Sequence, residues 1–95
     1  MTYKIIFDRR ALKEWNKLGE TLQQQFKSKL AERAKNPRVQ ADKLKGEPDL
    51  YKIKLRSAGY RLVYQVRDQE ITIMIISIGK RERSEVYETA HYRLN

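Results

Sequence analysis

Hydrophobic and polar positions alternate along much of this chain in the pattern of β-strands. The alternation predicts strands over residues 2–7, 50–56, 60–67 and 70–79. The turns at residues 57–59 and 68–69 are short, so we expect the last three strands to form an antiparallel meander. In the last strand, Ile71, Ile73 and Ile75 alternate with other residues, but Ile76 and Ile78 break that alternation. We therefore expect this strand to be central in the sheet and covered on both faces for part of its length.

Two helices are expected between the first and second strands. Asp8 can cap the first helix and Gly19 can end it, while Thr21 and Gln24 form a capping-box pattern for the second. The second helix should end just before Pro37. The apolar stripes are Leu12, Trp15 and Leu18 in the first helix and Leu22, Phe26, Leu30 and Ala34 in the second. The short connection predicts an antiparallel helical hairpin.

A short helix is expected at the C-terminal end of the chain. Ser84 can cap it, and its narrow apolar stripe of Val86, Ala90 and Leu94 predicts weak attachment to the rest of the protein. The predicted fold is α+β, in a single domain over residues 1–95. It consists of an N-terminal strand and helical hairpin packed on a curved, mainly antiparallel four-stranded sheet, with a short C-terminal helix.

The composition narrows the classes of protein to which the chain can belong. Its 95 residues suffice for one modest core. The absence of cysteine excludes disulfides and thiolate metal sites and is typical of the cytoplasm. The N-terminus lacks the apolar run of a signal peptide, and the longest apolar stretch, residues 73–78, is too short to span a bilayer. We therefore expect a soluble cytoplasmic protein without a membrane partner.

The charge balance indicates a polyanionic partner. The chain has 21 Lys and Arg against 12 Asp and Glu, a net charge of +9. Such an excess favours nucleic acid first, then an acidic protein, then a membrane surface. An ordinary basic domain is the alternative, and charge alone does not distinguish binding from catalysis.

The segment YKIKLRSAGYRLVYQVRD, residues 51–68, places like charges on one face of a strand. Lys52 and Lys54 point to the same side, where like charges on neighbouring positions destabilise a sheet unless an anion lies over them. Arg61 lies on the adjacent strand, and the third strand of the meander leads to Arg81 and then Tyr87. On a curved sheet these side chains can share one concave surface.

Cations and a phenol in one place suit the cleavage of a phosphodiester. Positioned Lys and Arg donors stabilise the charge that builds on the phosphorane oxygens. The sequence has no carboxylate cluster or histidine pair for a metal, and His91, its only histidine, is expected in a solvated position. We therefore expect no cofactor and no metal, with the 2′-hydroxyl of RNA as the nucleophile. Crowded cations lower the pKa of a neighbouring Lys or Tyr from ~10.4 or ~10, which would tune an acid and a base. A solvated basic face with Tyr87 packing the last helix is the alternative.

Three segments resemble the RelE toxins of bacterial toxin–antitoxin pairs: YKIKLRSAGYRLVYQV, IISIGKRERSEVY and RALKEWNKLGE. The resemblance spans essentially the whole chain. It implies a ribosome-dependent endoribonuclease that cuts messenger RNA codons in the ribosomal A site and leaves a 2′,3′-cyclic phosphate. The family's functional positions fall on Lys52, Lys54, Arg61, Arg81 and Tyr87. The resemblance makes Tyr87 or a neighbouring cation the base and Lys54 or Arg81 the acid, while Lys52 and Arg61 stabilise the phosphorane.

The resemblance also implies partners. They are a cognate RelB-type antitoxin that wraps and blocks the toxin, the 70S ribosome carrying mRNA, and operator DNA bound only through the antitoxin complex. The weak terminal helix is a candidate for displacement by the antitoxin. The cations expected to bind RNA or the ribosome are Lys13, Lys17, Lys27, Lys29 and Arg56.

Two other functions are considered. A ParE-like relative shares the fold but poisons DNA gyrase and lacks the ribonuclease residues, so the complete set argues against it. A noncatalytic RNA- or ribosome-binding module would tolerate scattered Lys and Arg and would not require Tyr87.

Overall fold

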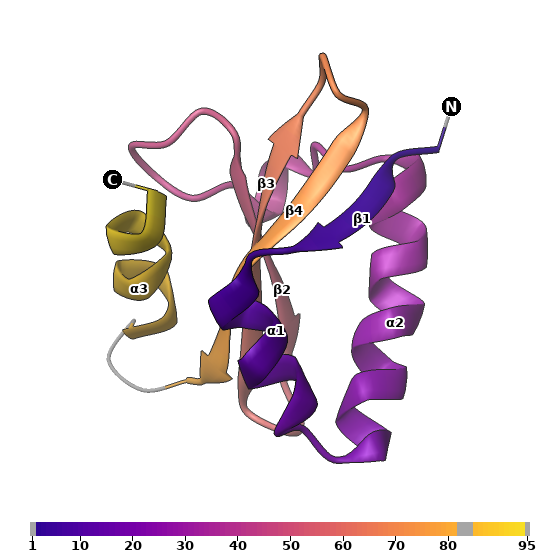
Figure 1. Ribbon diagram of the computed structural model, residues 1–95, viewed down its shortest axis with the longest axis vertical. Helices are drawn as coiled ribbons and strands as arrows, with labels where there is room; N and C mark the ends of the chain where they lie inside the picture. Colours follow the sequence, from indigo (N-terminus) through magenta and orange to yellow (C-terminus); the bar gives the residue numbers. More distant parts are fainter. Residues whose placement is uncertain (1, 82–84, 95) are drawn as a thin grey trace.

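The computed structural model describes residues 2–81 and 85–94 and confirms the predicted α+β architecture (Figure 1). The elements in chain order are β1 (Lys4–Phe7), α1 (Arg9–Asn16), α2 (Glu20–Lys35), the 3₁₀ turn η1 (Gln40–Asp42), β2 (Leu50–Leu55), β3 (Tyr60–Arg67), β4 (Thr72–Lys80) and α3 (Glu85–Leu94). Ser84, the expected cap of the last helix, lies outside the described residues. Within the described ranges, no helix is long and apolar enough to cross a membrane.

The four strands form one open sheet in the order β1-β4-β3-β2. The pairs β2–β3 and β3–β4 are antiparallel, as the short turns predict, whereas β1 lies parallel to β4. The central position of β4 is confirmed, and most of its residues are buried. The sheet is therefore mainly antiparallel with one parallel edge strand.

A register shift in β4 explains why its hydrophobic alternation breaks. Val63 pairs with Ser77, but the next residue of β3, Tyr64, pairs with Ile75, so Ile76 is an extra residue on β4. Such a bulge changes the face to which the following side chains point. Ile75 and Ile78, three positions apart, accordingly pack in the same cluster with α1 and α2, while Ile76 packs in the cluster shared with α3.

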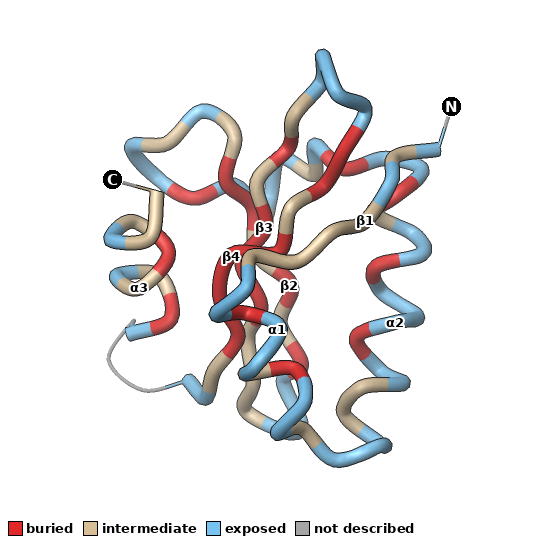
Figure 2. Tube along the Cα trace, viewed as in Figure 1, coloured by how far each residue is buried: buried red, intermediate tan, exposed pale blue. Residues whose placement is uncertain are grey.

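Helices lie on both sides of the sheet (Figures 1 and 2), and each face carries a hydrophobic cluster. The hairpin α1–α2 covers one face, where Trp15 contacts Phe26 with ring centroids 6.3 Å apart. The helix α3 covers part of the other face through Val86 and Ala90. Buried residues in Figure 2 lie on the sides of α2 and α3 that face the sheet. The half-buried residues Lys52, Lys54 and Arg61 lie on this second face, beside α3.

The helix boundaries differ in part from the sequence prediction. The Asp8 side chain accepts a hydrogen bond from the Arg10 amide, as a cap should. Gly19 does not end α1; it precedes the first residue of α2 with extended backbone (φ −67°, ψ 159°), so Thr21 lies inside that helix instead of capping it. Leu12 is 41% exposed because Ala11 and Trp15 form the buried side of α1.

The β3–β4 turn is longer than predicted. Ile71 is not part of the strand; it ends the turn in the left-handed region at φ 50° and is 37% exposed. Its amide donates to the Asp68 carbonyl at 3.1 Å. The backbone must reverse here before β4 starts at Thr72, and a β-branched residue is unfavourable in that conformation.

Candidate active site

The strands β2 and β3 carry three of the predicted cations on the face that α3 covers in part. Lys54 pairs in register with Arg61, and Lys52 pairs with Val63, which packs against α3. Cross-strand partners point to the same face. The predicted common face of Lys52 and Lys54 is therefore confirmed, with Arg61 directly beside Lys54.

The helix α3 brings Tyr87 to these cations. The ring of Tyr87 is partly buried and has the Lys52 Nζ at 5.7 Å and the Arg61 Cζ at 5.5 Å from its centroid. These distances suit cation–π attraction. The Arg61 guanidinium also donates a hydrogen bond to the Tyr87 phenol oxygen. The phenol is thus held at the cations by two kinds of contact.

Arg81 directly follows the last residue of β4 and lies near the cations of β2 and β3. Its backbone amide donates to the Gly59 carbonyl at 2.7 Å, which fixes Arg81 against the β2–β3 turn. Gly59 has φ 69°, a conformation that favours glycine, so the turn depends on this residue type. Arg81 shares one small surface pocket with Lys54 and Arg61.

Within residues 2–81 and 85–94, the positive charges at this surface have no carboxylate paired with them. Among the described residues, Lys52, Lys54, Arg61 and Arg81 form no ion pair with a carboxylate. The charge of Lys52 lowers the pKa of Lys54 below its usual value, with further lowering by desolvation, Arg61 and Arg56. Repulsion between neighbouring cations favours the binding of an anion.

A polar cluster on the opposite side of β2 supports Lys52. Arg33 of α2 donates to the Lys52 carbonyl at 3.0 Å and to the Tyr64 phenol oxygen at 2.9 Å, and it pairs with Asp42. The Tyr64 hydroxyl in turn donates to the Pro37 carbonyl at 2.6 Å. The contacts of Arg33 with β2 and β3 could not be predicted from the sequence, because nothing in the pattern of a helix shows that one of its arginines points toward the sheet.

The cations expected to contact RNA are exposed but do not form a single surface patch with the site. Lys29 and Arg56 line a larger pocket that also includes Lys54. Lys27 lies elsewhere on α2, at an apolar groove with Ile5, Phe7, Trp15, Leu30 and Ala31. Lys13 and Lys17 are exposed on or just after α1, and neither lines a pocket that contains a predicted catalytic residue. The structure thus brings only Lys29 and Arg56 next to the site.

His91 is not simply solvated as expected. Its Nδ1 lies 3.1 Å from a carboxylate oxygen of Glu47, in the loop before β2, and its side chain is only partly exposed. Within residues 2–81 and 85–94, no group of three or more His, Cys, Asp or Glu side chains is arranged to hold a metal ion.

The fold and the whole sequence match a group of bacterial toxins. Residues 5–85 match the family model described as the ParE toxin of type II toxin–antitoxin systems, parDE. Over 94 residues, 99% of both chains, the protein is 60% identical to the mRNA interferase toxin RelE of Escherichia coli strain K12. The chain belongs to the RelE toxin family. The mRNA interferase RelE of Shigella flexneri is equally similar, at 60% identity over 99% of both chains.

Solved structures of RelE toxins have the same fold. The free E. coli toxin RelE with two arginines replaced by alanine superposes with a TM-score of 0.92, at 57% identity and with full coverage of both chains. The toxin in the intact E. coli RelBE toxin–antitoxin complex gives a TM-score of 0.82 at 59% identity, covering 85% of this chain and 99% of that chain. The family model carries the name of ParE, whereas the curated relatives that share 60% of the sequence over 99% of both chains are RelE toxins, which argues against the ParE alternative.

Proposed function

We propose that this RelE toxin is an endoribonuclease that cleaves messenger RNA in the ribosomal A site and thereby inhibits translation. The observation that carries the proposal is the contact of the Tyr87 phenol with Lys52 and Arg61, beside a pocket that Arg61 shares with Lys54 and Arg81. Relatives that share 60% of its sequence over nearly the whole chain are mRNA interferases. A binding module or a gyrase poison has no need for a phenol held between a lysine and an arginine.

The scissile phosphate would lie in the pocket shared by Lys54, Arg61 and Arg81. Attack by the neighbouring 2′-hydroxyl oxygen forms a bond to phosphorus while the bond to the 5′-oxygen breaks. The products are a 2′,3′-cyclic phosphate and a free 5′-hydroxyl. Negative charge builds on the equatorial phosphorane oxygens, and cations already fixed in place stabilise it without reorganisation. The nucleophile belongs to the substrate, so we propose a reaction that needs no metal.

The two proton transfers are assigned to two residues that neighbour Arg61, namely Tyr87 and Lys54. Tyr87 accepts the proton of the 2′-hydroxyl, because its phenol oxygen is held at Arg61, beside the pocket proposed for the phosphate. Lys54 donates a proton to the departing 5′-oxygen, because the lowered pKa of its ammonium group makes it a better acid than an unperturbed lysine. Lys52 and Arg81 act as electrostatic stabilisers.

The partners follow from the charge and from the relatives. The RelE toxin of E. coli forms a complex with the antitoxin RelB, and we propose a RelB-type antitoxin for this chain. Ribosomal RNA and mRNA suit a net charge of +9. Operator DNA would be bound only through the antitoxin complex.

Toeprinting of a translated message on purified ribosomes tests the proposal. The parent protein should give cuts in phase with codons and only in ribosome-bound message. Arg81→Ala should remove these cuts without unfolding the protein, because Arg81 is exposed and makes its structural contact through its backbone. Lys80→Ala is the matched control, since Lys80 is the exposed neighbouring cation and lines no pocket with the site.

Three results would contradict the proposal. Equal cutting by Arg81→Ala would remove Arg81 from the site. Inhibition of translation without cuts would favour the noncatalytic binding module. Stabilised gyrase cleavage complexes with intact message would favour the ParE-like activity.

A further inference from the structure

The strand β1 ends before β4 does, and two charged side chains occupy the edge of β4 that is left without a partner. The parallel pairing stops at Phe7 and Ile75. Beyond that point, the Ile76 carbonyl accepts from Arg93 at 2.7 Å, and the Ile78 amide donates to Glu14 at 3.1 Å. Unpaired backbone groups on a partly buried strand are unfavourable. Glu14 and Arg93 satisfy them where the β1 backbone would otherwise have done so.

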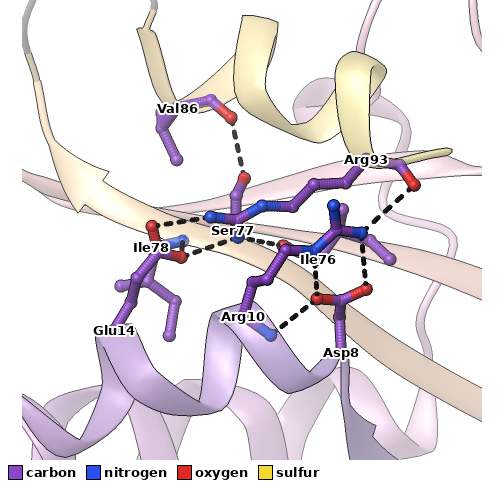
Figure 3. A network of polar contacts seen from close by, with 8 residues as sticks. All are labelled: Asp8, Arg10, Glu14, Ile76, Ser77, Ile78, Val86 and Arg93. Carbon is purple, nitrogen blue, oxygen red and sulfur yellow. Dashed lines mark hydrogen bonds and ion pairs between the residues drawn. The ribbon is translucent and has the colours of Figure 1, made fainter. Parts of the chain in front are cut away.

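The same two side chains bind each other and link α1 to α3 (Figure 3). Arg93 forms a two-pronged ion pair with Glu14, with nitrogen–oxygen distances of 2.8 and 3.1 Å. The Arg93 side chain is only 11% exposed, so water screens this pair weakly. Arg10 of α1 adds a bond of 3.4 Å to the Arg93 carbonyl, near the end of α3. We call the Glu14–Arg93 pair with its two bonds to β4 the α3 clamp.

A second contact holds the other end of α3. The Ser77 hydroxyl, which is buried, donates to the Val86 carbonyl at 2.7 Å. Tyr87 directly follows Val86, so it lies between this contact and the α3 clamp. The apolar contact of α3 is narrow, with only Val86 and Ala90 of its residues buried. Such a stripe allows a helix to shift or rotate, whereas polar contacts at both ends fix its position.

We propose that Glu14 and Arg93 are positioning residues for Tyr87: the α3 clamp sets the rotation and height of α3, and so keeps the phenol oxygen at Arg61. The proposal rests on the function proposed above, in which Tyr87 accepts a proton. The main core, between the sheet and the hairpin α1–α2, contains no residue of α3. Loss of the clamp should therefore misplace Tyr87 while leaving the fold in place.

A double-mutant cycle separates positioning from general destabilisation. Arg93→Met keeps the length of the stem and removes the guanidinium, and Glu14→Gln removes the other charge. Single-turnover cleavage on ribosomes should fall about 10- to 100-fold in each variant, in the range of a misplaced general base. In a Tyr87→Ala background the same changes should cost less than about threefold, because the group that they position is absent. Arg93→Lys should rescue only in part, since lysine keeps the charge but loses the two-pronged geometry.

Arg38→Met is the matched control. Arg38 also forms ion pairs, with Asp49 and Asp68, but on loop and turn residues outside the site. It should change cleavage by the same factor with and without Tyr87. The proposal is wrong if Arg93→Met lowers the cleavage rate by the same factor in the parent and in the Tyr87→Ala background. It is also wrong if Arg93→Met causes no loss of cleavage in the parent.

Hydrogen exchange gives a readout that does not depend on cleavage. In Arg93→Met the amides of residues 85–94 should exchange at least about tenfold faster, with β3 and β4 unchanged. Unchanged exchange in α3 overturns the proposal. If the parent protein cuts no RNA, the proposed function fails, and the exchange experiment still decides whether the clamp holds α3.

Discussion

The Arg61 guanidinium donates a hydrogen bond to the phenol oxygen of Tyr87, a residue 26 positions further along the chain. The bond joins the middle of the sheet to the C-terminal helix. It also places a permanent positive charge against the oxygen that is proposed to accept a proton. Arg61 faces Lys54 across the strand pair, so one residue connects the proposed base to the proposed acid.

Tyr87→Phe tests whether the phenol oxygen takes part in the chemistry. It removes the hydroxyl and keeps the ring, whose contacts with Lys52 and Arg61 remain available. If the hydroxyl transfers a proton, single-turnover cleavage on ribosomes should fall by about 10²-fold or more. Near-parental cleavage by Tyr87→Phe, with strong loss only in Tyr87→Ala, would instead assign the ring a stacking role.

The pH dependence of cleavage tests Lys54 as the acid. An ammonium group can donate a proton only while it is charged, so the rate should fall as the pH rises through the pKa of Lys54. The charge of Lys52 is the largest cause that lowers this pKa. Lys52→Met should therefore raise the pKa and move the falling limb to higher pH, besides lowering the maximal rate.

The profile is measured in single-turnover reactions between about pH 6 and pH 10, around the range where a perturbed lysine titrates. Arg56→Met should shift the limb in the same direction but less, because Arg56 is a smaller cause. A limb that does not move in Lys52→Met would exclude Lys54 as the titrating group.

Salt dependence of ribosome binding distinguishes two lysines of α2 that the sequence does not separate. Lys29 lines the pocket that contains Lys54 and Arg56, whereas Lys27 borders an apolar groove. If Lys29 contacts an RNA phosphate, Lys29→Ala should reduce the slope of log K against log salt by about 0.7 to 0.9. Lys27→Ala should leave the slope unchanged. Equal effects of the two substitutions would mean that the pocket does not guide RNA.

Ile71→Gly tests the strain in the β3–β4 turn. Ile71 adopts φ 50°, which costs an L-residue about 1–2 kcal/mol, and glycine removes this cost. Lost burial and the flexibility of glycine offset part of the gain, so we expect a net increase of about 0.5–1 kcal/mol in the free energy of unfolding. Urea unfolding measures the change.

Gly46→Ala is the opposite control. Gly46 has φ 81°, and an added Cβ would meet no atom within 4 Å, so the change adds backbone strain without a clash. It should lower the free energy of unfolding by about 1 kcal/mol. A loss of stability in Ile71→Gly would show that the Ile71 side chain contributes more than its backbone conformation costs.

Features that depend on nearby residues could be predicted from the sequence. The period of two places Lys52 and Lys54 on one face of β2, because side-chain direction in a strand is a local property. Asp8 caps α1 through an amide two positions away. The break in alternation from Ile75 to Ile76 predicts burial on both faces, which is confirmed. The bulge that returns Ile78 to the Ile75 side was not predictable, because it depends on pairing with β3.

Only the tertiary structure decided which distant groups meet. Glu14 and Arg93 are 79 positions apart, and Arg33 reaches Lys52 from the far side of its strand. These contacts depend on strand order and on the place where β1 ends, and neither leaves a periodic pattern in the sequence. The common face of Lys52 and Lys54 was therefore predictable from alternation, while the chemistry assigned to the site stays a prediction. The arrangement that holds Tyr87 at Arg61 was not predictable, because it results from the packing of α3 on one face of the sheet and from the contacts of Arg93 with Glu14 and β4.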